Sequence, residues 1–159
     1  MKMQHNEELV DLFQDYCAHH EAVYHFSPLT AQIYTYIMFN NNRDGVTFDE
    51  LVERLHASKS SVSTSLNLLI SNNQIEHFNK MDERKRFFRL NPNFIIIRLQ
   101  LIRDMLDREQ ALSQKMQNFL KNGEINANNC QTKMDIYISH LSTSKEQLRE
   151  TIEQLKSTN

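Results

Sequence analysis

The chain has 159 residues, of which 40% are hydrophobic and 24% charged, and its formal net charge is −2. This composition is typical of a folded protein, and the length allows one domain with an attached arm. The slightly negative charge excludes a protein that coats nucleic acid by bulk charge. Only two Gly and two Pro occur, which favours long helices over many short strands.

Cysteine spacing and hydropathy narrow the expected class of protein and its expected location. Cys17 and Cys130 lie far apart and form no Cys-x-x-Cys pair, which predicts no disulfide framework and fits a reducing cytosol. No segment approaches the ~18 apolar residues that cross a bilayer. The first residues lack the apolar segment of a signal peptide. We therefore expect a cytoplasmic protein without membrane contact.

The first third of the chain predicts two helices. An amphipathic pattern runs over about residues 6–26, with apolar side chains at helical spacing. Ser27 and Pro28 are the start signal of a second helix, because Ser is a good N-cap and Pro is favoured in the first turn. The second helix is expected to end in the asparagines at 40–42, and Gly45 then allows a turn.

Two short capped helices come next, joined by very few residues. Thr47 and Glu50 have the spacing of a capping box, in which each side chain bonds to the backbone N–H of the other. After the link at 56–57, Ser58 caps the next helix. Two such helices in succession predict a helix-turn-helix. The apolar stripe that we expect the second one to bury consists of Val62, Leu66 and Leu69.

After these helices, the spacing of the apolar residues changes from that of a helix to that of short strands. Apolar positions at 75–78 and 87–90 predict two short strands on either side of a polar tip at 80–85, and Pro92 closes the hairpin. Residues 43–91 hold eight Lys or Arg, against one in residues 1–42. A nearly neutral chain with a local basic cluster suits a focused contact with an anion. The cluster consists of Lys80, Arg84, Lys85, Arg86 and Arg89.

Two long helices, at about 93–121 and 131–156, are predicted for the rest of the chain. In the last one, apolar residues recur at alternating spacings of four and three, with Lys145 at the one missing position, which is typical of a coiled-coil seam. The first helix of the chain can add apolar side chains to the same body. The residues to which we assign dimerisation are Leu9, Leu12, Phe13, Met134, Ile138, Leu141, Leu148, Ile152 and Leu155.

The exposed face of the second short helix carries groups that suit DNA. Short hydroxyl and amide side chains with one cation can bond phosphates and base edges without blocking entry into the major groove. The free N–H groups at the helix start suit a phosphate. A polar helix face is often only solvated, but a basic hairpin behind two capped helices favours DNA. The expected contacts are Ser58, Lys59, Ser60, Ser63, Thr64 and Asn67 in the helix, and Lys80, Arg84, Lys85 and Arg86 in the hairpin.

The stretch from Ser27 to Leu90 resembles the winged-helix domain of the multiple-antibiotic-resistance-regulator (MarR) family, in its GbsR-like branch. The similarity lies in SPLTAQIYTYIMFN, in TFDELVERLHASKSSVSTSLNLLISNNQIE and in the wing MDERKRFFRL. It implies that Ser61 joins the DNA contacts, and that Asp82 and Arg84 are the family's Asp-x-Arg pair. Family wings often carry Gly where this chain has Met81. The resemblance also implies a homodimer held by the terminal helices and a small-molecule effector.

The sequence thus predicts a mainly α fold with a small β-hairpin wing, a winged helix-turn-helix plus a helical dimerisation arm. We expect an N-terminal dimerisation helix at 1–26, the DNA-binding domain at 27–91 and a C-terminal helical dimerisation region at 92–159. The expected function is a transcription regulator, a repressor, that binds a pseudo-palindromic operator as a homodimer. Its expected partners are double-stranded DNA, a second copy and an effector of unknown identity.

Two alternatives to this function stay open. A winged helix can serve only as a protein-interaction module, which would predict an acidic or apolar wing. The second alternative is a metal- or thiol-responsive sensor of the same fold, because Cys17, His19, His20 and His25 lie close together in the sequence. No spacing among them matches a tetrahedral zinc site. No Walker loop, Gly-x-Gly-x-x-Gly or His-Glu-x-x-His motif is present, so we expect neither an enzyme nor a bound metal or cofactor.

Aromatic and methionine side chains offer a hypothesis for the effector site. Such residues can line a pocket between a DNA-binding domain and a dimerisation arm, although a core or interface role is the preferred interpretation. The residues concerned are Tyr34, Tyr36, Met38, Phe39, Phe94, Met105 and Met116.

Overall fold

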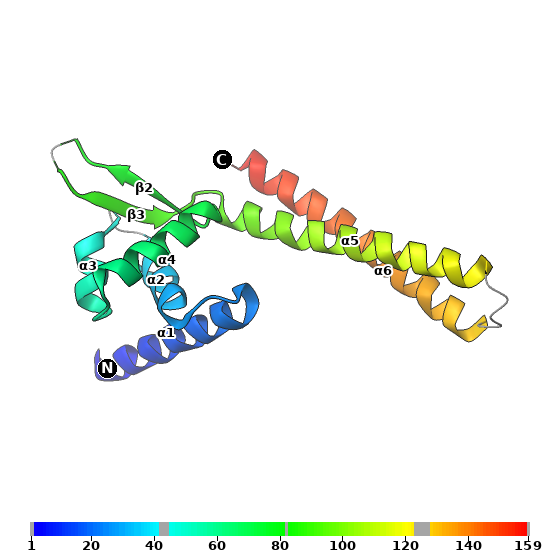
Figure 1. Ribbon diagram of the computed structural model, residues 1–159, viewed down its shortest axis with the longest axis horizontal. Coiled ribbons are helices and arrows are strands. Elements are labelled where there is room, and N and C mark those ends of the chain that lie inside the picture. Colours follow the sequence, from blue (N-terminus) through cyan, green and yellow to red (C-terminus); the bar gives the residue numbers. More distant parts are fainter. Residues whose placement is uncertain (1, 42–44, 82, 123–127, 159) are drawn as a thin grey trace. The chain divides into compact units, whose positions relative to one another are not determined.

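The computed structural model describes residues 2–41, 45–81, 83–122 and 128–158 (Figure 1). The chain divides into two compact units, Met1–Phe94 and Ile95–Asn159. Within the described ranges, the first unit contains four helices and a small sheet, and the second is a pair of long helices.

The first two helices of the chain pack against each other in the first unit. They are α1 (Lys2–Tyr24) and α2 (Pro28–Phe39). The predicted start of α2 is confirmed, since the hydroxyl of Ser27 accepts a hydrogen bond from the N–H of Thr30 and Pro28 stands in the first turn. Helix α1 thus packs against α2 of its own chain and belongs to the same compact unit as the rest of residues 2–94 that the structure describes.

Helices α3 (Phe48–Arg54) and α4 (Lys59–Ser71) form the predicted helix-turn-helix. The hydroxyl of Thr47 accepts from the N–H of Glu50 at 3.2 Å, and the hydroxyl of Ser58 accepts from the N–H of Ser61 at 3.1 Å, so both predicted N-caps are confirmed. Between the helices, His56 takes a left-handed φ of 49° and turns the chain. Such a φ is uncommon for a residue other than glycine.

The core of the first unit lies where α2, α4 and the sheet meet. The predicted stripe of α4 is confirmed as buried, and it packs with side chains of α2, α3 and the strands. The largest fully buried hydrophobic side chains of this core are Ile33, Ile37, Val46, Leu51, Val62, Leu69 and Ile75.

The sheet has three antiparallel strands in the order β1-β3-β2. Strands β2 (Ile75–Asn79) and β3 (Arg86–Leu90) form the predicted hairpin. Strand β1 (Val46–Thr47) was not predicted, because two residues carry no hydrophobic period; it pairs with the middle of β3. The helix-turn-helix is therefore attached to the wing by strand pairing as well as by the chain itself.

Gly45 enters β1 with a φ of +91° and lies against the wing. A Cβ placed there would come within 2.8 Å of the Phe78 ring and 3.0 Å of the Phe87 Cβ. Real Cβ atoms essentially never approach a heavy atom at 2.8 Å. Glycine at this position therefore permits both the turn and the close approach of the aromatic ring.

The second unit is an antiparallel pair of helices, α5 (Phe94–Asn122) and α6 (Asn128–Ser157), as Figure 1 shows. The ammonium of Lys145 forms an ion pair with Asp107 and donates to the amide oxygen of Gln110 at 2.6 Å. The amide of Gln117 donates to Asp135 nearer the turn. Lys145, the one polar position of the predicted seam, therefore faces polar groups on α5.

The seam of α6 packs against α5 of the same chain. Leu141 and Ile152 are only 3% and 2% exposed, and Met134, Ile138 and Leu148 are half-buried. The coiled-coil pattern predicted that this seam forms the contact between two copies. For Leu141 and Ile152 this is corrected, since burial within one chain leaves them almost no surface for a partner. None of the described helices is both long and apolar enough to cross a membrane.

Candidate nucleic-acid interface

Helix α4 presents its predicted polar face to solvent. Every expected contact on it is exposed, namely Ser58, Lys59, Ser60, Ser61, Ser63, Thr64 and Asn67. At the helix start the hydroxyl of Ser58 lies 3.0 Å from that of Ser60 and 2.8 Å from that of Ser61. The side chains of Ser63 and Asn67 form no hydrogen bond with any described residue, so they are available to base edges or phosphates.

A buried hydrogen bond between α2 and α4 fixes the orientation of α4. The hydroxyl of Thr30 on α2 donates to that of Ser65 on α4 at 3.0 Å, and both side chains are buried. This pair was not among the predicted site residues. The sequence feature that indicates this hydrogen bond is a Ser at position 65, inside the apolar stripe of α4, together with a Thr in the first turn of α2. A buried hydroxyl pair of this kind fixes rotation of α4 because an unpaired buried hydroxyl is costly.

Two cations of the predicted basic cluster are held against the strands of the wing. The guanidinium of Arg89 bonds to the carboxylate of Glu76 at 2.6 Å and lies over the Phe78 ring, 4.8 Å from its centroid. The ammonium of Lys80 lies 4.2 Å from the centroid of the Phe87 ring. These contacts hold the Arg89 side chain on β2 and the Lys80 side chain on the Phe87 ring.

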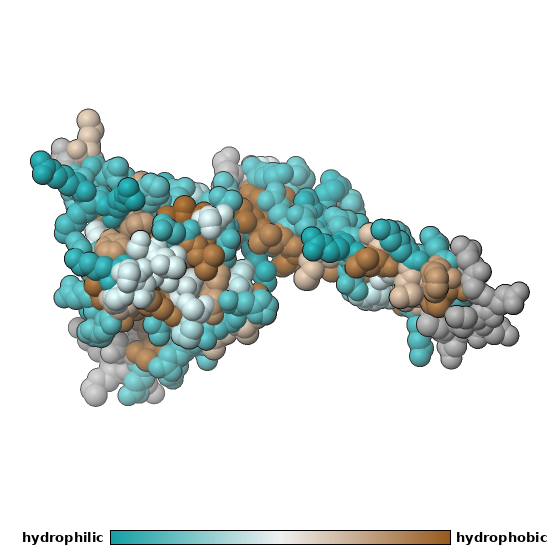
Figure 2. Space-filling view, in the orientation of Figure 1, coloured by the Kyte–Doolittle hydropathy of each residue, from teal (hydrophilic) through white to brown (hydrophobic). Residues whose placement is uncertain are grey.

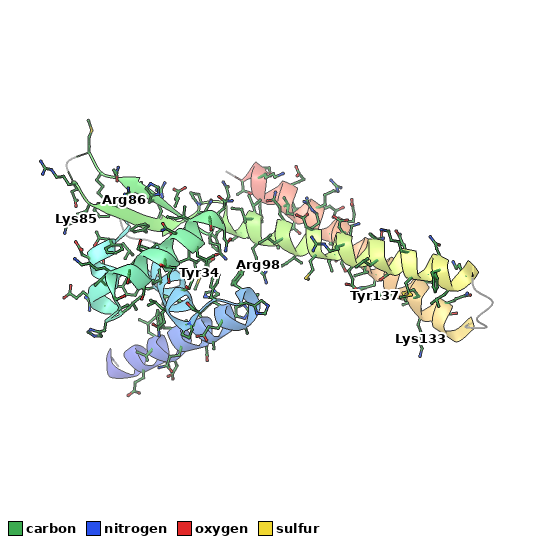
Figure 3. The ribbon with its side chains drawn as sticks, in the orientation of Figure 1. Tyr34, Lys85, Arg86, Arg98, Lys133 and Tyr137 are labelled. Carbon is green, nitrogen blue, oxygen red and sulfur yellow. The ribbon has the colours of Figure 1, made fainter. Side chains whose placement is uncertain are left out.

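Three other cations extend from the wing tip. Arg84, Lys85 and Arg86 are exposed and form no ion pair with a described residue, and Figure 3 shows Lys85 and Arg86 at the end of the hairpin. Asp82, the predicted partner of Arg84, lies outside the described residues. Met81 is fully exposed without a left-handed φ, so position 81 itself does not require a glycine.

The predicted metal-ligand candidates of α1 divide between core and surface. Cys17 and His20 are buried against α2, where the Nδ1 of His20 lies 2.9 Å from the Thr35 hydroxyl, whereas His19 and His25 are exposed. Among the described residues, no three His, Cys, Asp or Glu side chains converge on a point that a metal could occupy. Burial raises the pKa of the Cys17 thiol, which favours its protonated form.

The aromatic and methionine residues considered for an effector pocket are divided between the two units. Tyr34 is buried in the core, and Met38 and Phe94 pack against it. Met105 and Met116 are exposed on α5. Tyr36 and Phe39 line the same cavity in the first unit.

A helix-turn-helix followed by an antiparallel hairpin defines a winged helix-turn-helix, and the predicted fold class is confirmed. A crystal structure of a transcriptional regulator superposes with a TM-score of 0.62 over 94% of this chain and 99% of its own, at 16% identity. This similarity establishes the shared fold.

Two further solved structures match more weakly. A mutant of MepR from a multidrug-resistant Staphylococcus aureus clinical isolate has a TM-score of 0.43 and 13% identity over 89% of this chain and 98% of its own. Staphylococcus aureus MarR in complex with salicylate and kanamycin has a TM-score of 0.37 and 15% identity, over 96% and 93%. No protein-family profile and no curated protein sequence matches the chain.

Proposed function

We propose that this protein is a sequence-specific DNA-binding transcription regulator of the MarR type, in its GbsR-like branch, and that it represses by occupying its operator. The observation that carries the proposal is the pairing, in one compact unit, of an exposed polar α4 face with a wing tip that bears Arg84, Lys85 and Arg86. One surface suits base edges and the other suits phosphates or the minor groove.

The exposed residues of α4 divide by position. Ser63, Thr64 and Asn67 lie beyond the first turn on the exposed face, where they would meet base edges in the major groove. Residues 58–61 surround the helix start, whose backbone N–H groups and partial positive charge favour a phosphate. In the wing, Asp82 would orient the Arg84 guanidinium through a charge-assisted hydrogen bond.

Dimerisation is part of the proposal, and exposed apolar residues support it. One face of α5 carries five large apolar side chains that are each more than half exposed, and Figure 2 shows apolar residues at the surface of this helix pair. Leu9 and Leu12 on α1 are also about half exposed. Surfaces of this kind on a small protein mark an interface. The α5 stripe consists of Leu101, Met105, Leu112, Met116 and Phe119.

Selection of bound sequences from random double-stranded DNA tests the proposed function. We expect enrichment of an inverted repeat whose half-sites lie about one duplex turn apart, because a two-fold dimer presents two α4 helices. An Asn67→Ala variant, selected in parallel, should enrich a sequence that differs within each half-site. Absence of any enrichment, together with binding that is insensitive to salt, would favour the protein-interaction module instead.

A further inference from the structure

Four exposed side chains form a line on α4, along the face opposite its buried stripe. They follow one another at intervals of four, three and four residues, which is the repeat of an α-helix. A recognition helix enters the major groove with the face that does not pack on its own domain, so this line is the part of α4 that would meet base edges. The line consists of Ser60, Thr64, Asn67 and Ser71.

Two hydroxyls of this line are already bonded within the helix. The Thr64 hydroxyl donates to the Ser60 carbonyl at 3.0 Å, and the Ser71 hydroxyl donates to the Leu68 carbonyl at 2.9 Å. A hydroxyl has a single hydrogen, so neither group can donate to a base while these bonds last. The side-chain amide of Asn67 forms no hydrogen bond with a described residue and keeps both its donor and its acceptor. Asn67 is therefore the amide that this line can offer to a base edge.

Apolar groups lie next to Asn67 on the same face of α4. Because the hydroxyl of Thr64 is engaged, its methyl group is what this side chain can add to a new contact. The side chain of Leu68 is 43% exposed, although the nearby Leu66 and Leu69 are buried. Residues three and four apart on a helix are neighbours, with Cβ atoms about 5–6 Å apart. Thr64, Asn67 and Leu68 therefore form one contiguous group, which we name the α4 triad.

The chemistry of the α4 triad fits A·T base pairs in the major groove. Adenine presents its N6 donor beside its N7 acceptor, and these match the acceptor and the donor of an asparagine amide. Guanine presents two acceptors and would leave the amide oxygen without a partner. Thymine is the base that carries a methyl group at this edge, and an exposed leucine beside a threonine methyl suits it.

We propose that Asn67 binds the N6 and N7 of an adenine in each half-site, and that Thr64 and Leu68 contact the C5 methyl of a neighbouring thymine. This assignment rests on the proposed function and names the base pairs that α4 reads. Failure of the chain to bind any selected duplex would overturn both. Binding to the selected duplex without dependence on an adenine N7 or a thymine methyl would overturn this assignment and leave DNA binding standing.

Removal of single groups from the DNA tests each contact while the protein stays unchanged. In the selected duplex, deoxyuridine replaces one thymine of each half-site at a time, which deletes only the C5 methyl. At one position we expect the affinity of the full chain, measured by fluorescence anisotropy, to fall about tenfold for the two half-sites together.

A double variant shows whether the α4 triad is the source of this loss. Thr64→Ser combined with Leu68→Ala keeps the hydroxyl and removes the apolar groups, so it should bind the thymine and uracil duplexes equally. Lys59→Gln, at an exposed position of the same helix, should weaken binding to both duplexes and keep the difference between them, because it removes a phosphate contact. An undiminished uracil effect in the double variant, or no position with an effect, would overturn the thymine contact.

A second base analogue tests the adenine contact. 7-Deazaadenine has a C–H group in place of N7 and still pairs with thymine. At one adenine of each half-site it should weaken binding at least about tenfold, and Asn67→Ala should bind the adenine and 7-deazaadenine duplexes with equal affinity. Ser63→Ala, a control at a neighbouring exposed position, should keep the full difference. If Asn67→Ala stays sensitive to 7-deazaadenine, or loses a sensitivity to 7-deazaguanine instead, the assignment of adenine to Asn67 is wrong.

Discussion

Single residues of the wing differ in role although their charges are the same. Arg84 forms no ion pair with a described residue, whereas Arg89 is bonded to Glu76 and lies on the Phe78 ring. A cation that already has a carboxylate partner contributes less to phosphate binding, because its charge is largely compensated.

Arg84→Ala should therefore weaken binding to all DNA sequences by about 1–2 kcal/mol and flatten the salt dependence, with a change in slope of about 1 per protomer. Arg89→Ala is the matched control, and we expect it to change the slope less. Fluorescence anisotropy with a specific and a scrambled duplex at several salt concentrations measures both effects. Unchanged affinity of Arg84→Ala at physiological salt would contradict the assignment of the wing.

His20 makes the stability of the first unit depend on pH. Burial, and to a smaller degree the neighbouring His19, lowers the pKa of His20 from 6.5 to about 4. The unfolded chain binds this proton more readily than the folded one, so His20 contributes stability above pH 6.5 that is lost as the pH falls towards 4. His20→Gln cannot be protonated and should lose less stability over this range. Urea midpoints at about pH 7 and about pH 4.5 for both proteins measure the difference, and parallel losses would contradict it.

At the scale of elements, the wing depends on a residue that lies outside the hairpin. Gly45 has a φ of +91° and has no room for a Cβ beside Phe78. We expect Gly45→Ala to lower the free energy of unfolding by about 1–3 kcal/mol, through backbone strain and the ring contact. In a Phe78→Leu background the ring contact is relieved while the close approach to the Phe87 Cβ remains, so the cost should fall but stay above the ~1 kcal/mol of the left-handed backbone alone. Urea denaturation measures all four proteins; an unchanged midpoint for Gly45→Ala would show that the turn relaxes freely.

Dimerisation is expected to depend on the α5 stripe. Leu112 is 57% exposed at the middle of this stripe, so Leu112→Glu should leave the fold intact while placing a charge in the proposed interface. We expect the unmodified protein to have twice the mass of one chain by light scattering at micromolar concentration, and Leu112→Glu to have the mass of one chain. Gln114→Glu adds the same charge at another exposed position of α5 and should remain a dimer. A dimeric Leu112→Glu would place the interface elsewhere.

For the whole molecule, the proposed DNA binding has to come from local charge, because the net charge is −2. The candidate phosphate ligands are Lys59, Lys80, Arg84, Lys85 and Arg86. Arg89 is left out because Glu76 holds it. If about half of the ten cations in a dimer neutralise phosphates, the slope of log affinity against log salt should be about −4 to −5. A slope near zero would exclude phosphate contacts, and a steep slope without preference for a symmetric site would exclude operator reading.

Local signals in the sequence determined most of the elements. Ser27, Thr47 and Ser58 are N-caps in the structure as predicted, because capping depends on side chains within three residues of the helix start. The buried stripe of α4 and the two strands of the wing followed from hydrophobic period alone. The exposed DNA-contact candidates of α4 could be placed for the same reason, since the buried stripe defines the opposite face.

The tertiary structure alone decided which surfaces meet. A coiled-coil pattern shows that α6 needs an apolar partner but does not say which one, and the partner is α5 of the same chain. Three contacts join residues that are far apart in sequence. They are the pairing of β1 with β3, the hydrogen bond between Thr30 and Ser65, and the ion pair between Arg89 and Glu76. Such contacts leave no local period or cap signal, because each depends on the packing of whole elements.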